Sequence, residues 1–370
     1  MNIGSSSTRA LVGALATIAV MWIGVGHGAE PDSPARTHGV GARPKICLVL
    51  SGGGARGAAH IGVLKVLEEL RIPIHCITGT SMGALVGAAY ATGMNVHEMD
   101  VITSRITTEL LFNEQPPRRE RSMRRKQDDF EPYVTPDIGY AEGNLVIAKG
   151  LVSGVQLETV LRELSKVKGF HRFDELPIQF RAVATDLVTG KAVVFDQGEL
   201  ANVMRASMAV PGAVAPAEFD GMMLVDGMLT ENLPVETARR LGAEVIIAVN
   251  VGSPLLNREQ LIGIRGVVSQ MLSILTEQNV QESLAKLTSA DILITPELAE
   301  YTTADFDKLA QIAPLGEAAA RKAAARLASL ALPPAEYAAL RKQQQVEVAA
   351  DVRPVDEIRF APLRHVNPRT

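Results

Sequence analysis

The chain has 370 residues, of which 47% are hydrophobic, and its formal net charge at pH 7 is −4. This apolar content is enough for one large core, or a core with a small appendage, so disorder throughout is excluded. The small negative charge also argues against a nucleic-acid binder, because such domains usually carry a basic surplus.

The amino-terminal segment is typical of an export signal. Arg9 provides a positive start, residues 10–26 form an uncharged apolar run, and small residues suited to cleavage follow. An uncleaved membrane anchor is the alternative, although the run is at the short limit for a helix that spans a bilayer. We expect residues 1–29 to be a cleaved signal peptide and residues 30–44 to be a flexible leader. The mature protein would then be periplasmic or secreted, with membrane association left open.

Strands and helices alternate along the rest of the chain. Residues 45–50 are typical of a buried strand, residues 58–70 have apolar residues at helical spacing, and residues 72–78 form a second strand. This βαβ unit leads directly into a helix at residues 84–92. We expect further strands at residues 180–185, 192–195, 223–225, 245–251 and 291–295, and helices at residues 234–241, 260–287, 315–330 and beyond Pro333. Such alternation predicts an α/β fold around a mainly parallel sheet.

Residues 105–150 differ from their surroundings and are interpreted as a long insertion. Within it, Arg118 to Lys126 contains six basic residues and one acidic residue. This segment is either a solvated loop without a partner or a site of attraction to anionic lipid headgroups, where each basic residue can add about 1 kcal/mol. The sequence gives no indication of the oligomeric state.

Two cysteines, Cys47 and Cys76, fall in the first two predicted strands. They are either small core residues or, if the two strands are neighbours, a single disulfide. The sequence contains no C-x-x-C pair and no H-E-x-x-H motif, so we expect no structural or catalytic metal and no cofactor.

The pentapeptide Gly79-Thr80-Ser81-Met82-Gly83 joins the second strand to the helix after it. A G-x-S-x-G match alone is weak, but a strand, a tight turn and a helix in this order are what a nucleophile elbow requires. A side chain at Gly79 or Gly83 would collide with neighbouring backbone, and the helix start adds a positive dipole near a developing negative charge. We therefore predict Ser81 as a nucleophile.

The hexapeptide Gly52-Gly53-Gly54-Ala55-Arg56-Gly57 follows the first strand. It also fits a dinucleotide-binding loop, but that interpretation needs an acidic residue at the end of the next strand, where this chain enters the Ser81 turn. The alternative is an oxyanion hole, because the consecutive glycines Gly52, Gly53 and Gly54 can point backbone N–H groups at one anion. Arg56 could orient this loop, contact a phosphate or form a surface ion pair.

Asp226 ends the strand predicted at residues 223–225 and is followed by Gly227. Active sites of α/β proteins collect at such strand ends, which favours Asp226 as the catalytic carboxylate. Asp186 is the competitor, but it stands beside a turn that it can cap.

A Ser-Asp-His hydrolase would have its histidine after the acid in chain order. The only histidine after Asp226 is His365 in the polar tail, whereas the histidines within the predicted fold precede the acid: His60, His75, His97 and His171. This placement predicts a two-residue mechanism in which Asp226 accepts the Ser81 proton directly.

Taken together, the glycine loop, the Ser81 pentapeptide and Asp226-Gly227 resemble the signature of patatin-like phospholipases, in the same order and with comparable gaps. The segment from Arg205 to Gly212 is also similar to that family. The resemblance implies a three-layer α/β/α fold, a Ser-Asp dyad, a glycine-loop oxyanion hole and calcium-independent hydrolysis of acyl esters in membrane lipids. Met228 departs from the family, which usually has Gly or Ala there, and this puts the substrate preference in doubt.

We therefore expect a catalytic domain at residues 45–298, with the insertion at residues 105–150, and a helical carboxyl-terminal region at residues 299–370. The expected reaction is release of fatty acids from phospholipids or lysophospholipids through an acyl-enzyme. A soluble-ester hydrolase or thioesterase with the same dyad is the alternative, and a lipid-binding protein without activity is the non-enzymatic one.

Overall fold

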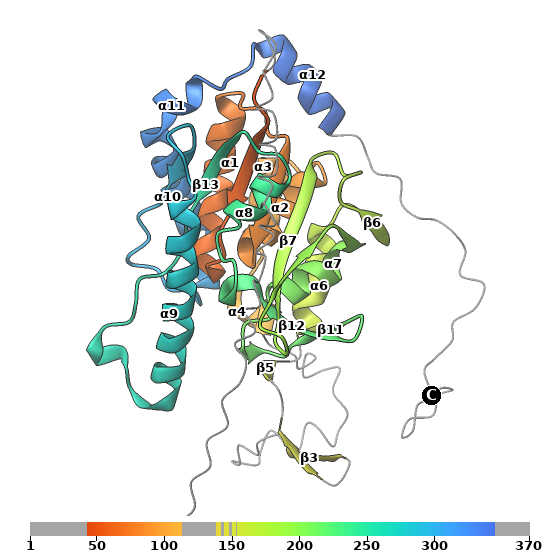
Figure 1. Ribbon diagram of the computed structural model, residues 1–370, viewed down its shortest axis with the longest axis vertical. Helices are drawn as coiled ribbons and strands as arrows, with labels where there is room; N and C mark the ends of the chain where they lie inside the picture. The colour runs from red at the N-terminus through yellow and green to blue at the C-terminus, as the bar shows by residue number, and fades with distance from the viewer. Residues whose placement is uncertain (1–42, 113–137, 142–143, 148–149, 153, 345–370) are drawn as a thin grey trace, which may run out of the picture. The chain divides into compact units, whose positions relative to one another are not determined.

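The computed structural model describes residues 43–112, 138–141, 144–147, 150–152 and 154–344 (Figure 1). The chain divides into two compact units, Met1–Arg43 and Pro44–Thr370, and every element described below belongs to the second. The expected signal peptide at residues 1–29, nearly all of the leader and the basic segment Arg118 to Lys126 lie outside the described residues.

An eight-stranded, mainly parallel sheet forms the centre of the second unit. Its order is β11-β12-β7-β2-β1-β13-β14, with β8 also paired to β7. The strands that pair in parallel are β1 (Ile46–Leu50), β2 (Cys76–Thr80), β7 (Gln179–Asp186), β13 (Val245–Val249) and β14 (Ile292–Ile294). The antiparallel strands are β8 (Ala192–Phe195), β11 (Ala217–Phe219) and β12 (Met222–Asp226).

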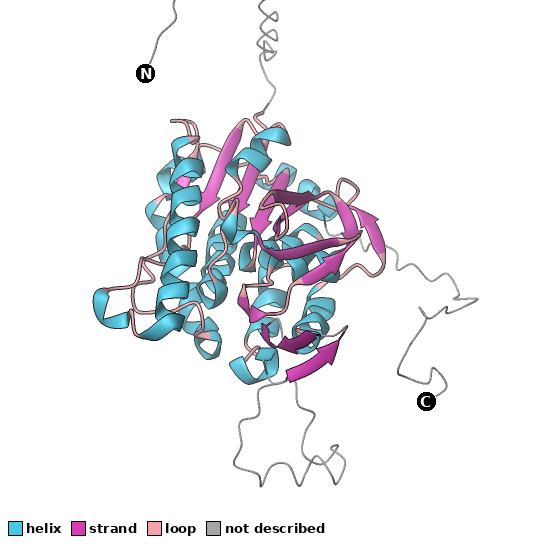
Figure 2. Ribbon diagram, turned by 60° about the horizontal axis from the view of Figure 1, so that its bottom comes forward, coloured by secondary structure: helices cyan, strands magenta, loops and turns pink. Residues whose placement is uncertain are grey.

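Helices cover both faces of this sheet, as Figures 1 and 2 show. Every residue of β1 is buried, and alternate residues belong to two different cores. Ile46, Leu48 and Leu50 pack into the larger core with α1 (Ala59–Glu69), α2 (Met82–Ala91) and α10 (Leu309–Lys322). Cys47 and Val49 pack into the smaller core with α8 (Val235–Arg240) and α9 (Gly263–Ala285). The predicted three-layer α/β/α fold is confirmed.

Shorter elements connect these layers. The remaining helices are η1 (Gly54–Ala58), α3 (Val96–Thr103), α4 (Thr108–Phe112), α6 (Val155–Leu164), α7 (Leu200–Ser207), η3 (Gly227–Leu229), η4 (Arg258–Gln260), η5 (Phe306–Lys308), α11 (Ala324–Ala328) and α12 (Pro334–Gln344). Three small two-stranded sheets join β3 (Ile138–Ala141) to β4 (Asn144–Ile147), β5 (Gly150–Val152) to β10 (Gly212–Val214), and β6 (Phe170–Arg172) to β9 (Gln197–Glu199).

The second strand differs from its prediction at residues 72–78. It begins at Cys76 and ends at Thr80, because its pairing with β1 starts at Cys47 opposite Cys76. Pro73 has no N–H to contribute to a strand ladder. Ile72 and Ile74 are nevertheless buried in the larger core. Their apolar pattern explains why the predicted strand begins four residues before β2 does.

The helix predicted at residues 315–330 is two helices, α10 and α11, and α10 begins six residues earlier than predicted. It contains Pro314, although proline inside a helix removes a backbone hydrogen bond and is costly. Close packing against α1 offsets this cost, since Gly316 lies so near the Ala59 carbonyl that an added Cβ would collide with it. Tertiary contact therefore outweighs the local preference.

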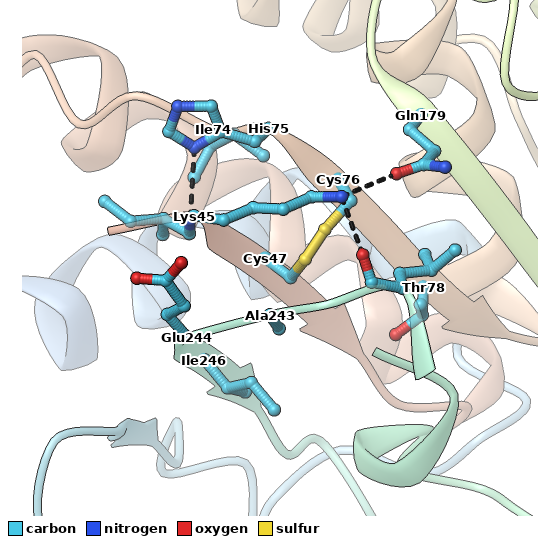
Figure 3. Close-up of a disulfide and its surroundings, with 12 residues drawn as sticks. Lys45, Cys47, Ile74, His75, Cys76, Thr78, Gln179, Ala243, Glu244 and Ile246 are labelled. Carbon is cyan, nitrogen blue, oxygen red and sulfur yellow. Dashed lines mark hydrogen bonds between the residues drawn. A yellow bond between two sulfur atoms is a disulfide. The ribbon is translucent and has the colours of Figure 1, made fainter. Parts of the chain in front are cut away.

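Cys47 and Cys76 form a disulfide between the neighbouring strands β1 and β2, with their Cα atoms 4.6 Å apart (Figure 3). Of the two interpretations left open by the sequence, the bridge is therefore correct. Nearby, Lys45 Nζ donates to Gln179 Oε1 at 3.0 Å and to the Leu241 carbonyl at 2.7 Å. These contacts tie together the amino-terminal end of the parallel strands.

In the part of the chain that the structure describes, no helix is both long and apolar enough to span a bilayer.

Candidate active site

Ser81 lies in a sharp turn between β2 and α2. Its backbone has φ 53° and ψ −124°, a conformation that is costly for a residue with a side chain and is typical of nucleophile elbows. Ser207 supports the turn, because its hydroxyl accepts the Ser81 N–H at 2.9 Å and donates to the Val183 carbonyl at 2.6 Å. Ser207 of α7 therefore links the strained turn to β7.

Two glycines flank this turn for steric reasons, as the pentapeptide predicts. A Cβ on Gly79 would collide with the carbonyl of Gly83, and a Cβ on Gly83 would collide with the carbonyl of Leu50 in β1. The end of β2, the start of α2 and the end of β1 therefore approach each other backbone to backbone.

Strand β7 brings Asp226 to Ser81. Val183 in β7 pairs with Thr80 of the parallel strand β2, and the next residue, Ala184, pairs with Asp226 of the antiparallel strand β12. Strands β2 and β12 consequently run toward each other and end at adjacent positions along β7. A Cβ on Gly227 would collide with the Val183 carbonyl, so this glycine is required where the chain leaves β12.

The Asp226 carboxyl is fully buried. Its Oδ1 accepts the Met228 N–H at 2.9 Å, whereas Oδ2 has no partner of standard hydrogen-bond geometry among the described residues. Burial raises the pKa of Asp226 from 3.8 to about 7, and hydrogen bonding to the Ser81 hydroxyl and to the Met228 N–H offsets only part of that rise. The carboxyl therefore combines proximity to Ser81 with a pKa suited to proton transfer near neutral pH.

The glycine loop lies against Ser81. A Cβ on Gly52 would approach the Ser81 Cβ to 3.0 Å. The N–H of Gly52 donates to the Asn232 carbonyl at 3.2 Å. It is therefore not available to an anion, contrary to the prediction for Gly52. Among the described residues, the N–H groups of Gly53 and Gly54 donate no hydrogen bond. Gly54 also has φ 56°, a conformation that favours glycine.

Arg56 is buried beneath this loop. Its guanidinium donates to four backbone carbonyls at 2.7–2.9 Å, those of Val251, Gly252, Leu298 and Tyr301. It therefore orients the loop, and the surface ion pair and the phosphate contact are both wrong. Gly57 contributes to the same packing, because a Cβ there would collide with the Met82 side chain.

The predicted residues open onto one cavity of about 420 Å³. Gly52, Gly53, Gly54, Ser81 and Asp226 all line it. Much of the remaining wall is apolar and consists of Leu111, Leu157, Met208, Val210, Ala213, Val214, Met228, Leu272, Val280 and Phe306. A cavity of this size with few convergent polar groups is typical of a small-molecule or lipid site.

Two asparagines that sequence reasoning missed support the site. Asn279 in α9 accepts the Asn232 N–H at 2.8 Å and donates to the Met228 carbonyl at 2.8 Å. It thereby fixes the segment after Asp226 against α9. The sequence offers no signal for Asn279, whereas Asn232 follows Asp226 closely and Ser207 lies in the family-like segment from Arg205 to Gly212.

The competing carboxylate, Asp186, caps the turn after β7, as its alternative interpretation predicts. It accepts the Val188 N–H at 3.1 Å and the Thr189 hydroxyl at 2.7 Å, and the Thr189 hydrogen bond is the main cause of its lowered pKa. Asp186 does not line the cavity.

None of the histidines among the described residues lines the cavity. His60 is fully buried, pairs with the Ser51 carbonyl at 2.8 Å and has its pKa lowered by burial to about 4. The Nδ1 atom of His75 accepts the Ile46 N–H at 3.1 Å at the opposite end of the strands (Figure 3). His97 is exposed, His171 pairs with the Lys168 carbonyl at 2.9 Å, and His365 lies outside the described residues.

Comparison with known proteins places these residues in a family. The model of the patatin-like phospholipase family matches residues 48–239. An uncharacterized NTE family protein of Mycobacterium bovis is 34% identical over 211 residues, which cover 56% of this chain and 49% of that protein. Lysophospholipase NTE1 of Scheffersomyces stipitis is 30% identical over 294 residues, which cover 73% of this chain and 17% of that protein.

The chain spans about half the length, or less, of these curated relatives. Among solved structures, VipD from Legionella pneumophila aligns with 78% of this chain and 67% of that one, at 16% identity and a TM-score of 0.38. The match to the family model covers more than half of the chain and includes the glycine loop, Ser81 and Asp226. The chain therefore belongs to the patatin-like phospholipase family.

Proposed function

We propose that this protein is a serine acyl hydrolase that releases fatty acids from phospholipids or lysophospholipids. The observation that carries the proposal is the buried Asp226 carboxyl beside the strained Ser81, since both residues line a largely apolar cavity. One oxygen of that carboxyl, Oδ2, has no hydrogen bond of standard geometry among the described residues. The family match supports lipid hydrolysis, and the relative from Scheffersomyces stipitis carries the name lysophospholipase.

In the acylation step, ionised Asp226 accepts the proton of the Ser81 hydroxyl while Oγ attacks the ester carbonyl. The tetrahedral intermediate collapses, the C–O bond to the leaving alcohol breaks, and Asp226 returns the proton to that alcohol. In deacylation, Asp226 accepts a proton from water, hydroxide attacks the acyl-enzyme, and Ser81 recovers its proton as the fatty acid leaves.

The N–H groups of Gly53 and Gly54 are the proposed oxyanion donors, since both residues line the cavity together with Ser81 and their N–H groups donate no hydrogen bond among the described residues. The amino-terminal end of α2 adds its positive dipole at the same place. Donors fixed in advance stabilise the developing charge without reorganisation during the reaction.

Export and membrane attraction complete the proposal. Residues 1–29 would be removed on export. Amino-terminal sequencing of the secreted protein tests this and should give Glu30 as the first residue. The basic segment Arg118 to Lys126 would attract anionic lipid. Replacing its basic residues with Gln should then flatten the salt dependence of binding to anionic vesicles and leave hydrolysis of a soluble ester intact.

The test of the activity is incubation of purified protein with mixed phospholipids, followed by mass spectrometry of released acids and lysolipids. Ser81→Ala is the control. Release of fatty acids that requires Ser81 would support the proposal. Turnover of short soluble esters or thioesters alone would indicate the alternative hydrolase, and binding of lipid without turnover would indicate a lipid-binding protein.

A further inference from the structure

Helix α9 exposes an apolar stripe to solvent. Ile264 and Met271 are 84% and 60% exposed, and the stripe repeats at helical spacing. Its members are Ile264, Val267, Val268, Met271, Ile274 and Leu275. Positions three and four apart lie on one side of a helix, so these side chains form one continuous face.

The other side of the same helix is more polar and faces the cavity. Ser269, Ser273, Thr276 and Glu277 line the cavity together with Leu272 and Val280. A surface helix of a globular protein normally has the reverse arrangement, with apolar residues inward. Packing within the described fold therefore does not account for the outward apolar face.

The apolar character is confined to one end of α9. Beyond Leu275 the exposed residues include Gln278, Gln281, Glu282 and Lys286. Before the helix, Leu255, Leu261 and Ile262 are also exposed. Figure 1 shows this first half of α9, together with η4, extending beyond the lower end of the sheet. We call the nine residues the α9 apolar surface: Leu255, Leu261, Ile262, Ile264, Val267, Val268, Met271, Ile274 and Leu275.

We propose that the α9 apolar surface docks the protein on a lipid bilayer, with the first half of the helix lying in the interface. Amphipathic helices of this kind bury an apolar face about 5–10 Å into the boundary between headgroups and acyl chains. The residues between Ser253 and Thr276 include only three charges, those of Arg258, Glu259 and Arg265. Attraction is therefore mainly apolar and requires no anionic lipid.

A bilayer fits this surface better than a second copy of the chain does. The helical stripe is about 18 Å long and about 10 Å wide. A stable dimer interface of about 800 Å² on each partner surrounds its apolar centre with a polar rim, whereas residues 266–276 of α9 include no charged residue. Insertion into lipid needs no complementary protein surface, so a stripe of this size is sufficient.

The position of α9 also connects this surface to the cavity. One side of the helix carries the apolar face and the other side lines the cavity that contains Ser81. The two sides belong to the same stretch of helix, residues 264–280. This inference deepens the proposed function, on which it rests: a docked protein would take lipid from the bilayer past α9 into the cavity.

The experiment measures binding to vesicles of zwitterionic phosphatidylcholine in a Ser81→Ala background, so that no hydrolysis alters the lipid. Ile264→Asn combined with Met271→Asn should weaken binding about tenfold or more. The matched control is Val188→Asn, because Val188 is 77% exposed in the turn after β7, outside the surface. Binding should change little in salt of about 1 M, where the Debye screening length falls to about 3 Å, because the attraction is mainly apolar.

A second variant tests insertion directly. The sequence has one tryptophan, Trp22, in the expected signal peptide, so Ile264→Trp places the only reporter in the mature chain. Its fluorescence should shift to shorter wavelength on addition of vesicles. In the active protein, the double variant should lose hydrolysis of vesicle lipid and keep hydrolysis of a soluble short-chain ester.

The outcomes separate this inference from the proposed function. Unchanged binding by the folded double variant, together with an unshifted fluorescence spectrum of the Ile264→Trp variant, would overturn the docking proposal. A wild-type dimer that the double variant converts to a monomer, without vesicle binding by either, would show instead that the surface joins two copies. Vesicle binding that depends on Ile264 and Met271, without any turnover by wild type, would support docking and refute only the activity.

Discussion

Asp226 meets Ser81 at the place along β7 where two strands running toward each other both end. The pairing register of the sheet therefore positions the two residues, and no flexible loop is needed to bring them together. Sites held on rigid elements keep their geometry better than sites on loops, which matters for a proton transfer over hydrogen-bond distance.

The first prediction concerns the dyad. Ser81→Ala and Asp226→Asn should each lower kcat by about 10³-fold or more, and the double variant should be little worse, since groups acting as one unit are not additive. Asp186→Asn is the matched control and should keep most activity, because Asp186 only caps a turn. Hydrolysis of a short-chain ester and labelling of Ser81 by a fluorophosphonate measure both effects. A folded His60→Gln variant as inactive as Ser81→Ala would refute the two-residue mechanism.

The second prediction is the pH dependence of the rate. Asp226 must be ionised to accept a proton, and its pKa is raised to about 7. The value of kcat/KM should therefore rise about tenfold per pH unit below 7 and level off above it. The profile should be measured with an uncharged ester, so that the substrate does not titrate. A break near pH 4 would contradict the raised pKa.

The third prediction concerns stability. A carboxyl whose pKa is higher in the folded state than in the unfolded chain favours folding less as pH rises between the two values. For Asp226 this window runs from 3.8 to about 7, and the lost stability is on the order of 4 kcal/mol. Asp226→Asn removes this loss, so urea unfolding should show the variant gaining stability relative to wild type from pH 4 to pH 8. A constant difference between the two proteins would refute it.

The fourth prediction concerns Ser207 as a positioning residue. Ser207→Ala removes the acceptor of the Ser81 N–H and should cost about 1–3 kcal/mol of stability, as expected for an unsatisfied buried donor. The strained turn should relax, so kcat and the rate of fluorophosphonate labelling should fall while KM changes little. Ser104→Ala is the control, because the exposed Ser104 hydroxyl donates to the Val101 carbonyl at 2.8 Å at the end of α3 and does not line the cavity. Full kcat in Ser207→Ala would show that the turn holds without this support.

The fifth prediction is that hydrolysis needs no metal ion. In the described parts of the chain, no three His, Cys, Asp or Glu side chains are grouped as a metal site would require. Excess chelator should leave the rate of ester hydrolysis unchanged. Loss of activity that calcium restores would count against a mechanism carried by Ser81 and Asp226 alone.

The sequence predicts best the features that depend on neighbouring residues. The strand at β8, the extent of β7 and the glycines of the Ser81 turn follow from local pattern and local sterics. The start of β2 and the course of α10 through Pro314 were missed, because pairing with β1 and packing on α1 decide them.

The same division holds for the site. Gly52 was expected to offer its N–H to an anion, but Asn232, 180 residues later in the chain, supplies the acceptor for it. Asn279 and the buried state of Arg56 likewise depend on contacts between distant segments. Contacts between distant segments produce no local pattern in the sequence around the residues involved. A single sequence therefore does not reveal them.

The Cys47–Cys76 bridge closes a ring of chain whose interior contains the glycine loop, η1 and α1. The two cysteines are 29 residues apart, and in the chain-entropy account a ring of this length stabilises the fold by roughly 3–4 kcal/mol. That contribution exists only where thiols are oxidised. If the chain is exported as proposed, the reduced precursor is the less stable form, and oxidation after export stabilises the segment that carries the glycine loop.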